Sequence, residues 1–245
     1  MWALCKKEFR QFFSNLTGYL VIGLFLLLNG LLLFALSSFN ILDFGYASLD
    51  NFFLLAPFVL LILIPSVTMR QISEEYKSGT MEILQTSPLS NRQIVLGKYL
   101  AALLVTTIAL LPTLTYALSI KALATTETIL DTGAWIGAYT GLILLCAVFC
   151  ALSLLAGSFT QNPVVALLTG ASLCFLLFKG MSAISSLSFL ANGPDFYLQK
   201  AGLEYHYQSV SRGVLNLSDL IYFFTLIAVF IYLTERRIGK NQASG

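Results

Sequence analysis

Long apolar runs separated by short polar segments are the main feature of this 245-residue sequence. A helix needs about 20 apolar residues to cross the core of a bilayer, and six of the runs, with their flanks, reach or approach that length. The expected fold class is therefore an all-α membrane protein, a single transmembrane domain over residues 1–245. Six transmembrane helices are predicted, at residues 19–38, 52–69, 100–120, 135–157, 164–187 and 217–234.

Two of the segments outside these spans predict helices that do not cross the membrane. Residues 1–15 combine aromatic and aliphatic side chains with four early charges, a composition that favours an interfacial helix in the headgroup layer. Residues 188–216 interleave apolar and polar side chains and are too polar to span. We expect one or two short amphipathic helices there, at the membrane surface.

The densest polar segment, residues 70–98, interrupts the apolar pattern between the second and third spans. It predicts a helix that is broken at Ser78–Gly79 and that ends at Ser87–Pro88, because the residue before a proline is disfavoured in the α conformation. Ser90 is then a favourable N-cap for the helix that leads back into the membrane. A polar segment of this density in a membrane protein is typical of a contact with a soluble partner.

The composition supports the membrane class. Hydrophobic residues make up 57% of the chain and charged residues only 11%, whereas a soluble domain is about 25% charged. No basic block lies outside the spans, so nucleic-acid binding is not expected. No cleavable signal peptide is expected either, because the N-terminal segment has no short apolar region followed by a small-residue cleavage site. The cysteines predict small buried side chains rather than disulfides or a metal site; they are Cys5, Cys146, Cys150 and Cys174.

The distribution of basic residues predicts the orientation. Six spans place both termini on one side, and if that side is cytoplasmic, ten Lys and Arg residues lie inside and three outside. The positive-inside rule favours this arrangement, with residues 70–98 in the cytoplasm and residues 188–216 outside. Lys179, within the fifth span, is a candidate functional residue by its position, although its ammonium is expected to reach the outer interface.

The sequence lacks the residues of an active site. His206 is the only histidine, and no nucleophile is marked beside it. Glu74–Glu75 could be the paired acids of an intramembrane metalloprotease, but the later spans supply no histidine ligands. Gly97–Lys98 is followed by Tyr99, which does not match a P-loop. We therefore expect no catalytic, cofactor-binding or metal-binding residue in this chain.

Residues 70–98 resemble the cytoplasmic loop of the type-2 ABC exporter permeases. In that family a pattern close to E-E-x-x-x-G-T-x-E-x-L-x-x-x-P-L-S, followed by an apolar re-entry with G-K, lies between the second and third spans. The interfacial helix and the outer loop also fit the family's layout, so the resemblance covers nearly the whole chain. The matching residues are Glu74–Glu75, Gly79–Thr80, Glu82, Leu84, Pro88–Leu89–Ser90 and Gly97–Lys98.

Within that family, the string from Gly202 to Phe223 resembles the F-type permease subunit of the gliding-motility ABC transporters. The resemblance implies a multi-pass protein of the bacterial inner membrane. It also implies two partners, an ABC ATPase in two copies and a second, larger permease chain. ATP and Mg would be bound by the ATPase, and this chain itself would hold no cofactor.

The resemblance further implies a coupling helix around Met81–Thr86, which would present Met81, Ile83 and Leu84 to an apolar groove of the ATPase. Glu82 would supply a charge contact. Closure of the ATPase pair would then move the spans and open a path between the two permease chains. The coupling residues implied in this way are Glu74, Glu75, Gly79, Thr80, Met81, Glu82, Ile83, Leu84 and Pro88.

Three alternatives stay open from the sequence. The chain could be the permease of a related exporter for lipids, drugs or copper-enzyme maturation. It could be an integral membrane enzyme acting on lipid or peptide through His206 or the Glu74–Glu75 pair. It could also be a non-transporting anchor for a motility or secretion machine. The sequence assigns no substrate and no direction of transport.

Overall fold

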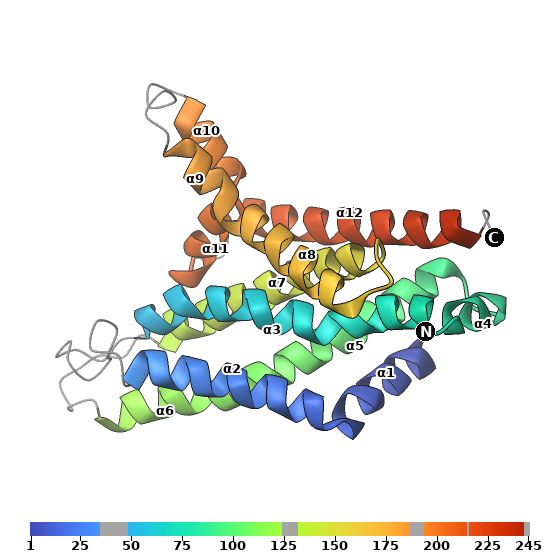
Figure 1. The fold of residues 1–245 in the computed structure, drawn as a ribbon. Helices are drawn as coiled ribbons and strands as arrows, with labels where there is room; N and C mark the ends of the chain where they lie inside the picture. The colour runs from blue at the N-terminus through green and yellow to red at the C-terminus, as the bar shows by residue number, and fades with distance from the viewer. Residues whose placement is uncertain (35–48, 124–131, 187–193, 215, 243–245) are drawn as a thin grey trace.

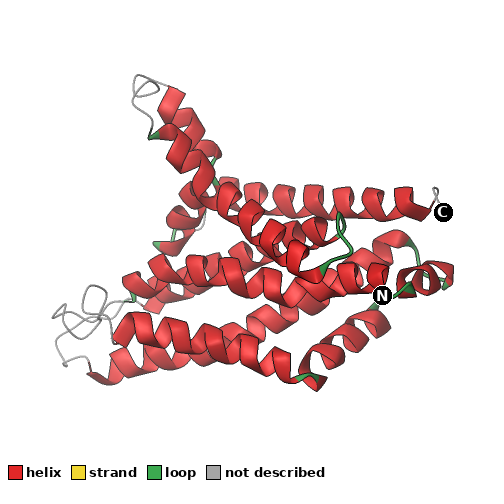
Figure 2. Cartoon of the chain, in the orientation of Figure 1, coloured by secondary structure: helices red, strands yellow, loops and turns green. Residues whose placement is uncertain are grey.

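The computed structural model describes residues 1–34, 49–123, 132–186, 194–214 and 216–242. Every regular element in these ranges is a helix (Figure 2). The elements in chain order are α1 (Trp2–Ser14), α2 (Leu16–Phe34), α3 (Asp50–Lys77), α4 (Thr80–Thr86), α5 (Asn91–Leu110), the 3-10 turn η1 (Leu111–Thr113), α6 (Leu114–Leu123), α7 (Thr132–Gly157), α8 (Pro163–Phe175), the π-helical turn η2 (Leu176–Gly180), α9 (Met181–Ser185), α10 (Pro194–Ala201), α11 (Leu203–Ser211) and α12 (Leu217–Gln242).

Six helices are long and apolar enough to cross a membrane, which confirms the predicted fold class. Two of them are continuous through a change of helix type, because η1 joins α5 to α6 and η2 joins α8 to α9. The predicted boundaries at residues 35–38 and 187 lie outside the described residues. The six spans run over Leu16–Phe34, Asp50–Lys77, Asn91–Ser119, Gly133–Gly157, Pro163–Ser185 and Leu217–Lys240.

The helix α7 forms the centre of the bundle and packs against α3, α5, α8, α11 and α12. Of its most apolar 18-residue stretch, 83% is buried, compared with 22% for α2 and 17% for α12. The peripheral helices therefore present apolar surface outwards, as expected for contact with lipid. Figure 1 shows both chain ends and α4 at one end of the bundle, with α10 and α11 at the other.

The helix α3 stays continuous although Pro57 and Pro65 lie inside it. A proline has no N–H, so Pro57 leaves the carbonyl of Phe53 without its usual intrahelical donor. The Tyr207 hydroxyl on α11 donates a hydrogen bond of 2.7 Å to that carbonyl oxygen. Burial raises the pKa of the Tyr207 phenol well above its ordinary value, so the group stays a donor at neutral pH. Tyr207 thus satisfies the backbone acceptor that Pro57 exposes.

We expect Tyr207→Phe to lower the free energy of unfolding by about 1 kcal/mol, because the Phe53 carbonyl would lose its donor in an apolar surrounding. Thermal unfolding of the detergent-purified chain measures the change. Tyr197→Phe is a suitable control, because Tyr197 is 75% exposed. An equal effect of the two substitutions would contradict this role of Tyr207.

The segment after the fifth span forms two short helices, as predicted. These are α10 and α11, and α11 packs against the bundle. Its Leu203, Tyr207 and Val210 are buried, and the helix packs on α7. The approach is close because a Cβ on Gly141 of α7 would lie only 3.1 Å from the Val210 side chain. The apolar face that the amphipathic pattern predicts for α11 is therefore buried against protein.

The cysteine prediction is confirmed. All of them are free and buried inside the helical bundle, and they contribute to packing as small apolar side chains. They are Cys5, Cys146, Cys150 and Cys174.

Candidate functional site at the α4 end of the bundle

The short helix α4 is bounded on both sides by residues that stop helices. Gly79 adopts a φ of 70°, a left-handed conformation that separates α3 from α4. Ser87, in front of Pro88, is extended and ends α4. Ser90 then caps α5 through a capping box with Gln93, as the sequence indicated for Ser90. The predicted order of helix, break, short helix and turn is confirmed.

The two sides of α4 differ in exposure. Met81 is only 1% exposed and belongs to the buried apolar cluster, whereas Ile83 is 71% exposed. Leu84 packs against that cluster, and Gln85 donates a hydrogen bond of 3.4 Å to the Ile238 carbonyl of α12. The expectation that Met81 faces a partner is therefore wrong, because its side chain anchors α4 to the bundle. Exposed side chains on α4 include Glu82, Ile83 and Thr86.

Glu74 and Glu75 do not form a pair of acids, although they are adjacent in the sequence. Successive residues of a helix point about 100° apart, and here Glu74 is exposed while Glu75 turns inwards. The Oε2 atom of Glu75 lies 2.7 Å from Nζ of Lys98. Glu75 is consequently engaged in the fold, which argues against a paired-carboxylate site and removes Glu75 as a free contact for a partner.

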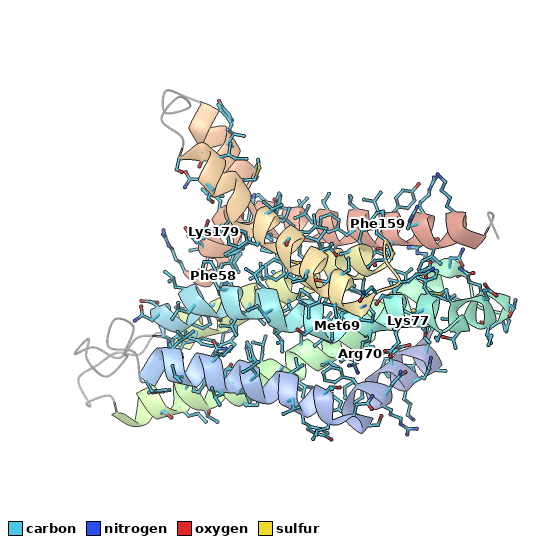
Figure 3. The ribbon with its side chains drawn as sticks, viewed as in Figure 1. Phe58, Met69, Arg70, Lys77, Phe159 and Lys179 are labelled. Atoms are coloured by element: carbon cyan, nitrogen blue, oxygen red, sulfur yellow. The ribbon has the colours of Figure 1, made fainter. Side chains whose placement is uncertain are left out.

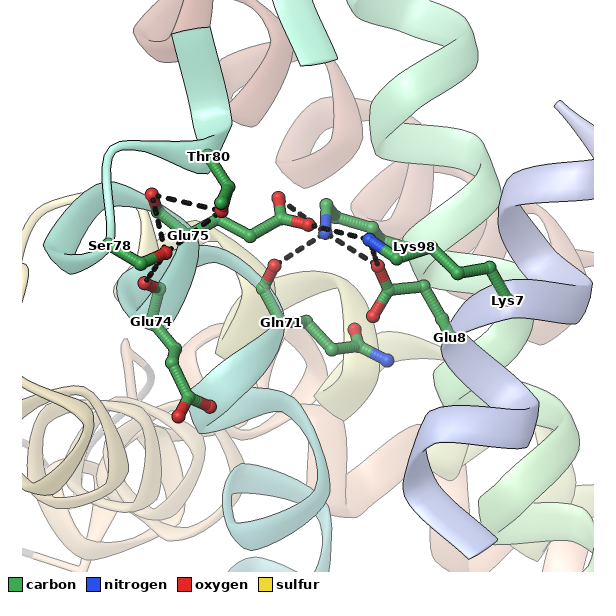
Figure 4. A network of polar contacts seen from close by, with 8 residues as sticks. All are labelled: Lys7, Glu8, Gln71, Glu74, Glu75, Ser78, Thr80 and Lys98. Atoms are coloured by element: carbon green, nitrogen blue, oxygen red, sulfur yellow. Dashed lines mark hydrogen bonds and ion pairs between the residues drawn. The ribbon is translucent and has the colours of Figure 1, made fainter. Parts of the chain in front are cut away.

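Lys98 is the centre of a buried network that joins three helices (Figure 4). Its side chain is 0% exposed, and its Nζ lies 3.0 Å from Oε1 of Glu8 on α1. The same ammonium donates a hydrogen bond of 2.5 Å to the Gln71 carbonyl of α3. Lys7 adds a contact of 3.3 Å to Oε1 of Glu75. A buried ammonium requires such partners, because desolvation of an unpaired charge costs several kcal/mol.

The residue before Lys98 explains how α1 approaches so closely. A Cβ on Gly97 would lie 3.1 Å from Cδ2 of Leu4 and 3.2 Å from the Met1 carbonyl oxygen. Gly97 therefore allows the contact between α1 and α5, and Lys98 binds the acid that α1 brings. The sequence predicted that Gly97–Lys98 belongs to the family pattern, but it did not predict that Glu8 binds Lys98. No local signal connects residues that are 90 positions apart.

Two candidate residues lie far from α4, at the other end of the bundle. Lys179, in the π-helical turn η2, forms an ion pair with Glu204 of α11 and lies 5.6 Å from the centre of the Phe58 ring (Figure 3). Its ammonium is thus held by an acid at that end of the bundle, and the expectation that it reaches the outer interface stays a prediction. His206 has its Nδ1 2.7 Å from Asp219 and stacks on Tyr222 at 4.0 Å between ring centres.

Across the described ranges, no group of three or more His, Cys, Asp or Glu side chains is arranged to hold a metal ion. His206 is buried within a packed contact between α11 and α12, and Glu74 and Glu75 point to different surroundings. His206 and the two glutamates, the residues on which the enzyme alternative depended, therefore do not form a common site.

The comparison with protein families agrees with the helical architecture and with the motif. The family model described as ABC-2 family transporter protein matches residues 2–242, which is nearly the whole chain. A comparison with curated proteins gives no match. The family is a transporter domain of membranes without an ATPase site of its own, and it implies an ABC ATPase as a partner. This 245-residue chain therefore belongs to the ABC-2 family of transporter proteins.

Proposed function

We propose that the chain is a permease subunit of an ATP-driven exporter and that α4, with its flanking turns, is the surface on which the ATPase docks. The end of the bundle that holds α4 and both termini would face the cytoplasm, in agreement with the excess of basic residues there. ATP and Mg would bind to two copies of the ATPase, and a second permease chain would complete the pathway.

The observation that supports this proposal best is the exposure of Ile83. Ile83 is an aliphatic side chain that is 71% exposed on a mostly polar helix, so it offers an apolar contact to a partner protein. Glu82 beside it is exposed and can make a charge contact. The same helix is fixed from behind by Met81 and Leu84, so a force on α4 would be passed on to the bundle.

The contacts behind α4 suggest how such a force would spread. Its inner face packs against α3, and Gln85 bonds to the end of α12. At the end of α3, Glu75 and the Gln71 carbonyl contact Lys98 of α5, which in turn contacts Glu8 of α1. A displacement of α4 on ATP binding would therefore move three spans and the N-terminal helix together.

The transport system is proposed from the motif alone. The string from Gly202 to Phe223 favours a gliding-motility ABC transporter of the bacterial inner membrane. Related exporters for lipids, drugs or copper-enzyme maturation are the alternatives. The genes beside this one distinguish these systems, because an adjacent ATPase and a larger permease of the gliding-motility type would be expected.

The docking proposal is tested by changing Glu82 and Ile83 to Lys together. Both side chains are exposed, so the fold should be kept, whereas the apolar contact and the sign of the charge are lost. We expect the ATPase to co-purify with the unmodified chain and the yield of the complex to fall at least tenfold with the double variant.

Lys6→Glu is the matched control, because it also reverses one exposed charge but lies on α1. It should leave the complex intact. If the double variant retained the ATPase and its full activity, α4 would not be the docking surface. The membrane insertion of all variants is checked by their yield in the membrane fraction.

A further inference from the structure

An open cavity of about 680 Å³ lies beside the Lys98 network, between α1, the start of α2 and the last turns of α3. Its volume is in the range of sites that take small molecules. The walls combine two kinds of surface. One part is polar and includes Lys7, Arg70, Gln71 and Glu74, and the other is apolar and includes Phe12, Leu20, Val21 and Val67.

The charges around the cavity are balanced. Three cations and three carboxylates surround it, if the buried Lys98 behind the wall is included. Lys98 and Lys7 are already paired with Glu8 and Glu75. Arg70 and Glu74 form no ion pair with any of the described residues. These two charges stand one helical turn apart, about 6 Å between their Cβ atoms, on one side of α3.

A third group points to a ligand that donates hydrogen bonds. Gln71 is 9% exposed and lines the cavity, and its Oε1 has no hydrogen-bond partner in the described part of the chain. A buried acceptor without a donor costs about 1–3 kcal/mol, so a bound donor would be favourable here. With the Glu74 carboxylate, Gln71 offers two acceptors close to one cation, Arg70.

The apolar wall leads from the cavity to the lipid-facing surface. Leu20 lines the cavity and is also part of a stripe of exposed leucines that follows α2 at helical spacing. Arg70 is the first charged residue after the apolar run of α3, so the polar part of the cavity lies at the level of the headgroups. The stripe consists of Leu16, Leu20, Leu24, Leu27 and Leu31.

We propose that this cavity binds a phospholipid whose headgroup carries a primary ammonium, such as phosphatidylethanolamine. The phosphate would pair with Arg70, and the ammonium would donate to Glu74 and, once the Gln71 side chain turns towards the cavity, to its Oε1. The acyl chains would follow Leu20 and the leucine stripe of α2. A purely anionic headgroup fits less well, because the acceptors of Glu74 and Gln71 would face it. A choline headgroup has no N–H to donate.

The test uses the full chain, purified in mild detergent and washed free of lipid. It is mixed with equal amounts of dioleoyl phosphatidylethanolamine, phosphatidylcholine and phosphatidylglycerol, and the bound lipids are counted by native mass spectrometry. We expect about a tenfold preference for phosphatidylethanolamine over phosphatidylcholine, the size of one charge-assisted hydrogen bond.

Substitutions of two exposed residues distinguish the contact with the ammonium from the contact with the phosphate. Glu74→Gln should abolish the preference over phosphatidylcholine, and Arg70→Gln should weaken the binding of both zwitterionic lipids. Lys77→Gln is the control, because Lys77 is an exposed cation on α3 that does not line the cavity. It should bind as the unmodified chain does.

The same lipid preference in all variants would overturn the proposal, and so would a preference for phosphatidylglycerol. Displacement of the lipid by soluble phosphoethanolamine at equal concentration would show that the ligand is a soluble molecule and would likewise overturn it. The measurement needs no ATPase, so its failure leaves the docking role of α4 untouched.

Discussion

Lys98→Met is expected to lower the free energy of unfolding by about 3–5 kcal/mol, the usual cost of removing one partner from a buried ion pair. The substitution leaves Glu8 and Glu75 with only the exposed Lys7 as a cation, and Glu8 is only 6% exposed. It also removes the donor to the Gln71 carbonyl. Thermal unfolding in detergent should show a large loss of stability, and limited proteolysis should cut first near α1.

Lys7→Met is the matched control for this prediction. Lys7 contacts the same two acids, but its side chain is 55% exposed, so its ion pairs should contribute only about 0–1 kcal/mol. Combining Lys98→Met with Glu8→Gln and Glu75→Gln should restore part of the lost stability, since no charge is then left buried and unpaired. Equal effects of Lys98→Met and Lys7→Met would show that Lys98 does not hold the network together.

Gly137→Ala is expected to destabilise the fold by about 3 kcal/mol, at the upper end of the cost of overpacking. A Cβ at position 137 would lie 2.6 Å from the Cα of Gly213, so two backbones would have to move apart. Gly213 has a φ of +84°, a conformation that few other residues adopt, and this limits how the turn after α11 can adjust. The substitution should therefore displace α11 from α7, and thermal unfolding measures the loss.

The control for Gly137→Ala is Gly23→Ala on α2, where no atom lies within 4 Å of the added Cβ. That change should cause no loss of stability and a gain of at most about 1 kcal/mol, because alanine favours a helix more than glycine does. Both substitutions add one methyl group to a glycine of a transmembrane helix, so they differ mainly in what the methyl group meets. A mild effect at position 137 would mean that α11 is not held tightly on α7.

The segment around α4 shows how far sequence reasoning reaches at the candidate site. Gly79, Pro88 and Ser90 act through their own backbone preferences, so the break, the turn and the capped helix were predictable. The direction in which Met81 points was not predictable from the sequence. A seven-residue helix has several apolar side chains, and any of them could be the one that is buried. Only its contacts with the bundle select Met81 as the anchor and leave Ile83 exposed.

The sequence by itself determined the fold class, the six spans and the family pattern in residues 70–98. These follow from local rules, because the bilayer requires about 20 apolar residues in a helix whose backbone groups are all bonded internally. Only the tertiary structure decided that Lys98 binds Glu8 and Glu75, that Lys179 binds Glu204, and that α11 packs on α7. Those contacts join residues distant in the chain, and the free energy that selects them comes from burial and charge pairing between helices.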